Sequence, residues 1–250
     1  MPTPATFTAP RRCLLGMAAG LLVPATIAAQ AAPLPSTGGI LVTPFVGWAT
    51  GTTRNEVWTY PDGSGATVRD EVAMNLAGGL ALGAVLQLPV RGAFSLLGGV
   101  TWIDRDDASF SIGGGEAWVF TGSTSLLAKA GFGLQLGAAD DAMAVRRLRA
   151  GMFLAPFYMI EKPREIPGID DSGLFDTASH FGVNLGLTGE LPFAGDRLAL
   201  QVGVDDYLTF YRTDPLRRLP DWLHAAPGTT VEVDATHQWL VRAGISLRLH

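Results

Sequence analysis

Hydrophobic and polar residues alternate with a period of two along much of the chain, and residues 239–250 show the pattern most clearly. Apolar residues stand at every second position from Trp239 to Leu249, and most positions between them hold Gly, Ser or Arg. A period of two is the side-chain repeat of a β-strand. Apolar residues on one face and small or charged residues on the other indicate a strand between lipid and a narrow polar interior.

The same alternation recurs in eight segments, which predict eight strands. They span residues 40–50, 72–88, 94–104, 118–136, 147–159, 180–191, 198–211 and 239–250. Short turns near 89–92, 138–141 and 194–197 separate longer polar stretches near 53–70, 106–116, 161–178 and 213–235. This alternation of connections is typical of outer-membrane barrels, whose long loops lie outside the cell. We therefore predict an all-β fold, an eight-stranded antiparallel up-and-down transmembrane β-barrel with both termini periplasmic.

The N-terminus has the features of an export signal. Arg11 and Arg12 precede an apolar segment over residues 14–23, and Ala29-Gln30-Ala31 fits a small-residue cleavage site. The predicted organisation is a signal peptide over 1–31, a short periplasmic segment over 32–38, and one outer-membrane barrel domain over 39–250.

The amino-acid composition further restricts the class of protein. Mean hydropathy is +0.25, yet beyond the N-terminus no apolar run approaches the roughly 20 residues that a membrane-spanning helix needs. The only cysteine, Cys13, falls in the predicted signal, so we expect no disulfide in the mature chain. Removal of the signal leaves 16 basic and 23 acidic residues, a net charge of −7, which argues against a nucleic-acid partner.

Aromatic residues gather at the ends of the predicted strands that adjoin the long loops. Amphipathic rings at one membrane interface form the girdle that is expected of such barrels. The predicted girdle consists of Trp48, Trp102, Trp118, Phe120, Tyr158, Phe181, Tyr211 and Trp239. A thinner second belt at the other interface would include Phe45, Phe94 and Phe193.

A soluble eight-stranded ligand-binding barrel of the lipocalin type is the competing fold. That fold needs apolar side chains inside and polar ones outside. Here the less apolar face is mostly Gly, Ala, Ser and Thr with isolated charges, which suits a narrow lumen better than a solvent-exposed surface.

Several charged residues fall on the predicted inner face. An eight-stranded barrel is just wide enough for its side chains to fill it, and charges enclosed there have to be paired. The predicted lumen network consists of Lys129, Arg147, Arg149, Glu190, Asp205, Arg242 and Arg248. It forms either a structural plug or a small gated pore whose ion pairs exchange partners, and no residue pattern separates the two.

The sequence gives less support to a catalytic or metal site than to the lumen network. His180 and His237 begin predicted strands near the outer rim, and Ser172, Ser179 and Asp176 lie near enough in sequence for a triad to be imagined. No spaced-histidine metal motif occurs, and the acidic clusters of the long stretches suit a solvated surface. We expect no catalytic residues, no metal and no cofactor.

Asp206 interrupts the apolar outward face of the seventh segment, between Val204 and Leu208. It lies either above the hydrocarbon layer or at a bulge that re-aims the chain. The sequence leaves both interpretations open.

Together, the export signal, eight amphipathic strands and C-terminal strand resemble the small outer-membrane β-barrels of Gram-negative bacteria, the OmpA/OmpX-like family, over residues 38–250. The resemblance implies a monomeric barrel in the cell outer membrane that contacts its lipids and lipopolysaccharide and is inserted by the barrel assembly machinery. This chain differs from the family at its last residues, Leu249-His250, because family members usually have an aromatic residue at the C-terminal position. We expect a non-enzymatic structural or surface-interaction role. The alternatives are a narrow channel or transporter for small or apolar solutes, or a lipid-modifying enzyme.

Overall fold

The computed structural model describes residues 39–113, 115, 118–120, 122–137, 148–164, 177–194, 197–214 and 225–249. Regular structure in these ranges consists of β-strands. No helix in the described part of the chain is long and apolar enough to cross a membrane. The strands are β1 (Ile40–Ala49), β2 (Thr52–Pro61), β3 (Thr67–Leu76), β4 (Gly79–Arg91), β5 (Phe94–Arg105), β6 (Ala108–Ile112), β7 (Trp118–Phe120), β8 (Ser123–Gly137), β9 (Arg149–Pro163), β10 (Ala178–Ala194), β11 (Leu198–Phe210), β12 (Thr230–Val233) and β13 (Thr236–Leu249).

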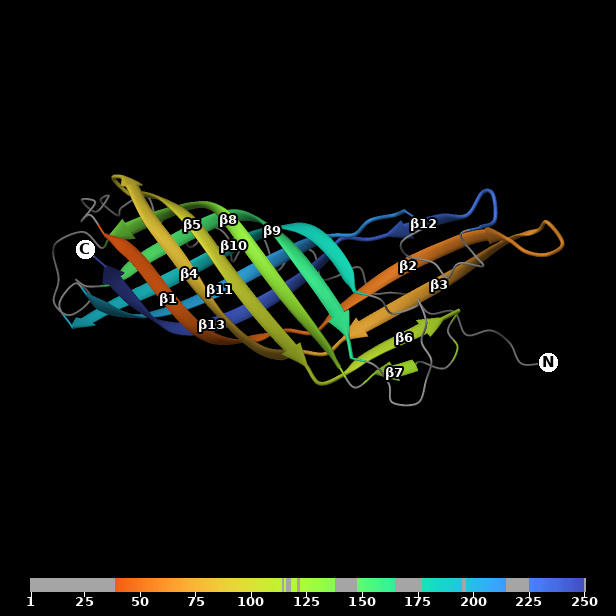
Figure 1. The fold of residues 1–250 in the computed structure, drawn as a ribbon, viewed down its shortest axis with the longest axis horizontal. Coiled ribbons are helices and arrows are strands. Elements are labelled where there is room, and N and C mark those ends of the chain that lie inside the picture. The colour runs from red at the N-terminus through yellow and green to blue at the C-terminus, as the bar shows by residue number, and fades with distance from the viewer. Residues whose placement is uncertain are drawn as a thin grey trace, which may run out of the picture.

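Eight of these strands close into an antiparallel barrel with the order β1-β13-β11-β10-β9-β8-β5-β4 (Figure 1). Closure is made by β1, which pairs with β13 on one side and with β4 on the other. The predicted eight-stranded antiparallel barrel is therefore confirmed. The predicted signal peptide and periplasmic segment lie outside the described residues.

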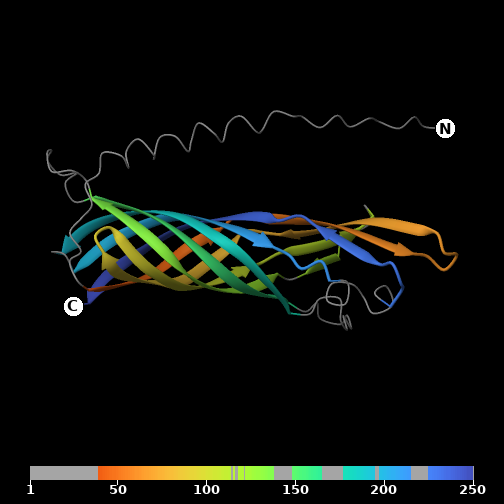
Figure 2. The same ribbon diagram turned by 90° about the horizontal axis from the view of Figure 1, so that it is seen from above.

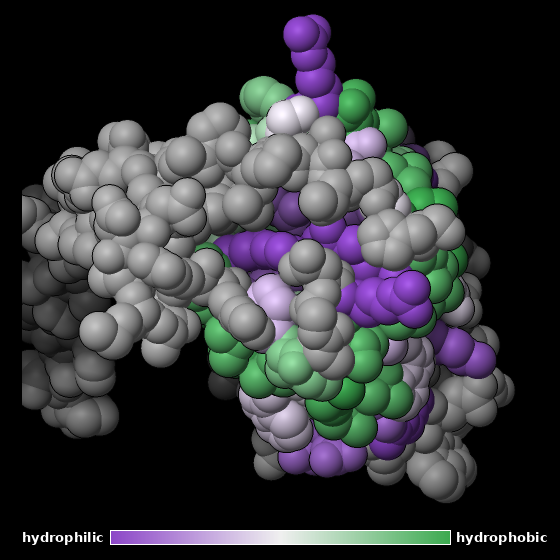
Figure 3. Space-filling model, turned by 90° about the vertical axis from the view of Figure 1, so that its left-hand side faces the viewer, coloured by the Kyte–Doolittle hydropathy of each residue, from purple (hydrophilic) through white to green (hydrophobic). Residues whose placement is uncertain are grey.

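The outer surface of the barrel is apolar, and its interior contains both apolar and polar side chains. Large apolar side chains point outward from every barrel strand; Phe132 is 68% exposed and Val241 is 57% exposed. An end-on view shows hydrophilic residues at the centre of the barrel and hydrophobic ones around its periphery (Figure 3). A soluble barrel would have the reverse distribution, so this is the architecture of a transmembrane barrel.

A second sheet of five strands, which we call the extension, projects from one end of the barrel (Figures 1 and 2). Its order is β12-β2-β3-β6-β7, which follows the order of the barrel strands that its members adjoin in sequence. The prediction of loops near 53–70 and 106–116, and over part of 213–235, is therefore wrong. Polar residues on the exposed face of these strands hid an alternation that buries residues such as Trp58 and Val72 on the other face.

Two-residue breaks separate the extension from the barrel, and we call this level the neck: residues 50–51, 77–78, 106–107 and 234–235. Buried residues on either side of a break are three apart, as with Leu76 and Gly79 or Arg105 and Ala108. A period of two cannot hold across an interval of three, so each break resets the face that a strand buries, as a bulge does. The predicted continuous strand over 72–88 is accordingly divided between β3 and β4.

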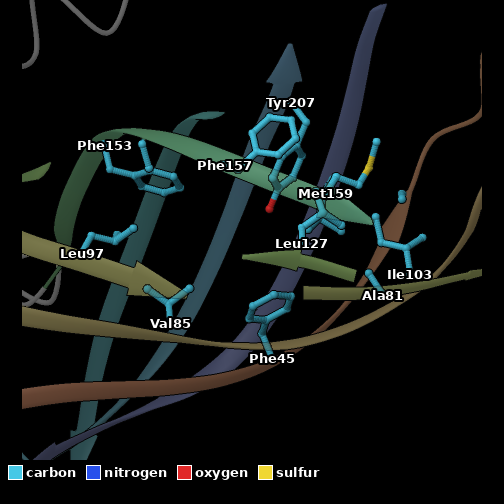
Figure 4. Close-up of a cluster of buried hydrophobic side chains, with 13 residues drawn as sticks. Phe45, Ala81, Val85, Leu97, Ile103, Leu127, Phe153, Phe157, Met159 and Tyr207 are labelled. Carbon is cyan, nitrogen blue, oxygen red and sulfur yellow. The ribbon is translucent and has the colours of Figure 1, made fainter. Parts of the chain in front are cut away.

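The lumen contains an apolar cluster that the sequence pattern did not predict. Phe45, Phe153, Phe157 and Tyr207 point into the barrel among smaller apolar side chains (Figure 4). Phe157 and Tyr207 meet edge to face, with ring centroids 5.3 Å apart. Phe45 is only 6% exposed, so its expected place in the second outer belt is wrong, whereas Phe94 and Phe193 do point outward.

Candidate functional site

Three buried charges meet at the centre of the lumen. Asp205 on β11 accepts hydrogen bonds through Oδ2 from Lys129 Nζ on β8, at 3.3 Å, and from Arg242 Nε on β13, at 3.0 Å. All three side chains are almost fully buried, with the Asp205 carboxylate inaccessible to solvent. One carboxylate therefore pairs with two cations from opposite strands, and these three residues form what we call the central triad.

Neutral polar groups and aromatic rings complete the surroundings of the two cations. Lys129 Nζ also donates to Asn184 Oδ1, at 2.7 Å, and Arg242 Nη1 donates to Gln201 Oε1, at 2.8 Å. Lys129 Nζ lies 4.5 Å from the centre of the Phe153 ring, and the Arg242 guanidinium lies 5.1 Å from that of Phe45. Cation–π contacts are strongest where water is excluded, so the apolar cluster and the central triad stabilise one another.

A second charged layer lies nearer the end of the barrel that holds the short turns. Arg149 Nη1 on β9 is 3.6 Å from Glu190 Oε1 on β10. Arg248 on β13 is buried on the same inner face and contributes to the electrostatic field at Glu190. Arg147, the remaining predicted member of the lumen network, lies outside the described residues.

A third polar layer, near the neck, was missed by the sequence analysis. Arg105 is 1% exposed and donates from Nη1 to Ser125 Oγ on the adjacent β8, at 2.7 Å, and across the lumen from Nη2 to Gln238 Oε1 on β13, at 3.0 Å. Glu161 is buried close enough to interact with it electrostatically. The inward positions of β5 run in steps of two to Arg105, so the signal was present one residue beyond the predicted strand end.

The extension contributes a side chain to the mouth of the barrel. Arg54 on β2 forms an ion pair with Glu56 at 2.8 Å, and its guanidinium lies 5.0 Å from the centre of the Tyr211 ring. Tyr211 in turn meets the buried His180 edge to face, at 4.7 Å, and its hydroxyl is 2.7 Å from Thr236 Oγ1. Residues on or next to the consecutive barrel strands β1, β13, β11 and β10 therefore meet beneath the extension.

The structure places the residues of the predicted aromatic girdle in different positions. Trp48, Trp102, Tyr158, Phe181 and Trp239 all point outward and are exposed. Tyr211 does not belong to the girdle, because the alternation of β11 places it on the inner side and Phe210 outside. Trp118 and Phe120 lie in β7 of the extension and not in a barrel strand, because the fourth predicted segment is broken before β8.

Asp206 is not at a bulge, because β11 pairs with β13 in continuous register through it. Its side chain belongs to the outward face and lies 2.9 Å from His237 Nδ1 on β13. His180, by contrast, points inward, so the two histidines of the imagined triad lie on opposite faces. Ser172 and Asp176 fall outside the described residues. Within the described ranges, no group of three metal-ligating side chains occurs.

No protein-family model matches the chain, and no curated protein matches its sequence. Among solved structures, the outer membrane protein OprG from Pseudomonas aeruginosa is similar with a TM-score of 0.46 and 12% identity, over 88% of this chain and 99% of that one. The outer membrane protease OmpT from Escherichia coli is similar with a TM-score of 0.44 and 7% identity, over 86% of this chain and 98% of that one. Neisserial surface protein A gives a TM-score of 0.38 and 9% identity, over 82% and 97%. Identities this low transfer no activity to this chain.

Proposed function

We propose that this chain is an outer-membrane barrel that does not conduct, has no catalytic activity, and has a structural or surface-interaction role. The observation that carries this proposal is the central triad, in which Asp205 joins Lys129 to Arg242 across the lumen. Aromatic rings pack against both cations. A solute passing through the barrel would have to separate buried ion pairs, and uncovering one buried charge costs roughly 3–5 kcal/mol.

The extension supports the second half of the proposal, the surface role. Strands β2 and β3 have ten residues each, so at about 3.3 Å per residue the sheet stands roughly 30 Å beyond the neck. Its outer face is rich in hydroxyl and amide groups, such as Thr53, Asn55 and Asn75. A rigid polar sheet of this height suits contact with molecules at the cell surface.

The proposed orientation follows from the connections. Short turns join barrel strands at one end, and the extension occupies the other (Figure 1). In outer-membrane barrels the short turns face the periplasm, so the extension would face outward, among lipopolysaccharide headgroups. We also propose that the protein is a monomer and that the barrel assembly machinery inserts it into the outer membrane.

A narrow channel is the second candidate, and one observation favours it. The described interior of the barrel holds more cations than carboxylates: Arg105, Lys129, Arg149, Arg242 and Arg248 against Glu161, Glu190 and Asp205. If the ion pairs opened, this excess of positive charge would make the lumen selective for anions.

Planar-bilayer recording of the refolded protein separates the two candidates. Refolding is verified first by a shift in gel mobility between boiled and unboiled samples. The plug predicts no stepwise current at any applied voltage. Anion-selective steps whose selectivity changes in Arg242→Gln would contradict the plug and identify the lumen as a channel.

A lipid-modifying activity is the remaining alternative. The exposed His237 and Asp206 pair is a general base of the kind that such chemistry uses, but a nucleophile beside it is needed as well. Lipid A from cells that produce or lack the protein should be identical by mass spectrometry if the non-enzymatic proposal holds.

A further inference from the structure

An open groove of about 380 Å³, which we call the neck cavity, lies at the neck, where β2, β3 and β6 leave the barrel. Most of its lining surface is apolar and includes Leu76 and Ala108, and its polar groups come from Thr52, Thr53, Asn75, Asp107 and Ser109. The volume is at the small end of the range of roughly 300–1,000 Å³ that is usual for ligand pockets. It is a space for one small molecule and is separate from the lumen network.

Hydrogen bonds between the strands fix the polar lining. Thr53 Oγ1 donates to Asn75 Oδ1 at 2.8 Å, and Asn75 Nδ2 donates to Ser109 Oγ at 3.4 Å. Each link uses only part of the capacity of these groups, because a hydroxyl offers a donor and two lone pairs and an amide offers two N–H donors. A row of ordered groups across three strands therefore retains donors and acceptors for a ligand.

The charge of the lining restricts the ligand. Asp107 is exposed, and its carboxylate has no hydrogen-bond or ion-pair partner among the described side chains. Among the residues that the structure describes, no lysine or arginine lines the cavity. Phosphate and sulfate groups are recognised by cationic side chains or helix N-termini, so the site does not fit an anion. It fits a neutral or amino-bearing molecule with several hydroxyl groups.

An aromatic ring flanks the same place. The Trp48 indole is 57% exposed and lies against Gly78, where an added Cβ would be 2.9 Å from its Nε1. Gly78 follows Ala77, which lines the cavity. Trp48 itself does not line the cavity but lies near its edge, and an amphipathic ring there suits a ligand with an apolar C–H face and a polar edge. A sugar ring has both.

We propose that the neck cavity binds one neutral or amino sugar ring, with Asp107, Asn75 and Ser109 at its hydroxyl groups and Trp48 near its C–H face. This goes beyond the proposed surface role and does not depend on whether the lumen conducts. The sugar could be a free saccharide or the headgroup of a surrounding glycolipid, since the neck directly adjoins the apolar outer surface of the barrel.

Saturation-transfer difference NMR on the refolded full chain in detergent micelles tests the site. The probes are methyl glucoside, N-acetylglucosamine and glucosamine, with glucose 6-phosphate as the anionic comparison. We expect transfer to the ring protons of the first three and weaker transfer to the phosphate. Asn75→Ala and Asp107→Ala should raise the dissociation constant about tenfold, the effect of losing one or two hydrogen bonds.

Ser109→Ala and Ser111→Ala provide a matched pair, because both serines occupy the same face of β6 but only Ser109 lines the cavity. Ser109→Ala should weaken sugar binding and Ser111→Ala should leave it unchanged. Gel mobility with and without boiling verifies the barrel in each variant. No transfer to any sugar, tighter binding of the phosphate, or equal effects of the two serine changes would overturn the proposal.

A second experiment distinguishes a free saccharide from a glycolipid headgroup. The protein is reconstituted into phosphatidylcholine vesicles with or without a glucosyl diacylglycerol, and transfer to the glucosyl protons is compared. Transfer to the lipid-borne ring assigns the site to glycolipid headgroups, and transfer to free methyl glucoside alone assigns it to soluble saccharides. Either result supports the site, and neither alters the conductance test of the lumen.

Discussion

At the scale of single residues, Asp205 should matter more than any other carboxylate of the barrel. Asp205→Asn leaves Lys129 and Arg242 buried without their shared anion, so we expect the free energy of unfolding to fall by about 3–5 kcal/mol. Urea unfolding of the refolded protein, followed by tryptophan fluorescence, measures the change. The neighbouring Asp206 is the control, because its partner His237 is well exposed and Asp206→Asn should cost about 1 kcal/mol or less. Equal losses would contradict the central triad.

Asp62, at the tip of the β2–β3 hairpin, gives a prediction about pH. Hydrogen bonds from the Ser64 hydroxyl and from the backbone N–H groups of Ser64 and Ala66 lower the pKa of its carboxyl group below the ordinary 3.8. A carboxyl group with a lowered folded-state pKa stabilises the turn above its unfolded pKa, and this contribution is lost as pH falls through the folded pKa. The amide resonances of Ser64 and Ala66 should therefore titrate with a midpoint below 3.8, and in Asp62→Asn they should not titrate. A midpoint at or above 3.8 would show that the bonds do not form.

The lumen residues show how far residue-level reasoning reaches. The period of two put Lys129, Asp205 and Arg242 on the inner face, and the structure has them there. Which charges pair depends on the register between strands and on the tilt of each strand, and neither is written in the alternation of one strand. The apolar cluster was missed for a related reason. Phe45, Phe153 and Phe157 share their face with small and polar residues, and only the closed barrel shows that the rings fill space between distant strands.

At the scale of elements, glycines on the inner face of β10 allow bulky neighbours to pack. A Cβ added at Gly186 would overlap the ring of Phe153 and approach Asp205 Oδ1. One added at Gly189, on the outward side of the same strand, would meet Val202 at an ordinary 3.6 Å and nothing else among the described residues. Gly186→Ala should therefore cost about 1–3 kcal/mol of stability through overpacking, and Gly189→Ala should be nearly neutral. Urea midpoints of the two variants test this, and a neutral Gly186→Ala would mean that the Phe153 ring is not held in place.

The elements also show where a pattern in sequence stops being informative. Each barrel strand was recognised because its alternation holds over most of its length. The extension was not, because the breaks at residues 50–51, 77–78 and 106–107 shift the buried face by one position. Beyond each break the alternation is out of step with that of the barrel strand, and polar residues such as Asn55 and Glu71 follow. Such a segment has the composition of a loop. A strand of the extension differs from a loop by its hydrogen-bonded pairing with other strands, which its own sequence does not show.

At the scale of the whole molecule, the two ends of the barrel differ in kind. One end carries tight turns, such as that between β4 and β5, and the other carries the extension. The proposed orientation exposes the extension outside the cell and leaves the turns in the periplasm. This polarity governs what the protein can contact, because the polar sheet and the neck cavity lie at the same end.

Cysteine labelling in whole cells tests the orientation, and the chain suits it because its one cysteine, Cys13, falls in the predicted signal segment. Ser64→Cys at the hairpin tip and Arg91→Cys at the end of β4 are both exposed but lie at opposite ends of the molecule. A membrane-impermeant maleimide should label Ser64→Cys in intact cells and label Arg91→Cys only after the outer membrane is permeabilised. The unmodified chain controls for Cys13, since it should remain unlabelled if that segment is removed. Labelling of Arg91→Cys but not Ser64→Cys in intact cells would reverse the orientation. The extension would then face the periplasm, and its proposed role at the cell surface would be wrong, while the filled lumen would be unaffected.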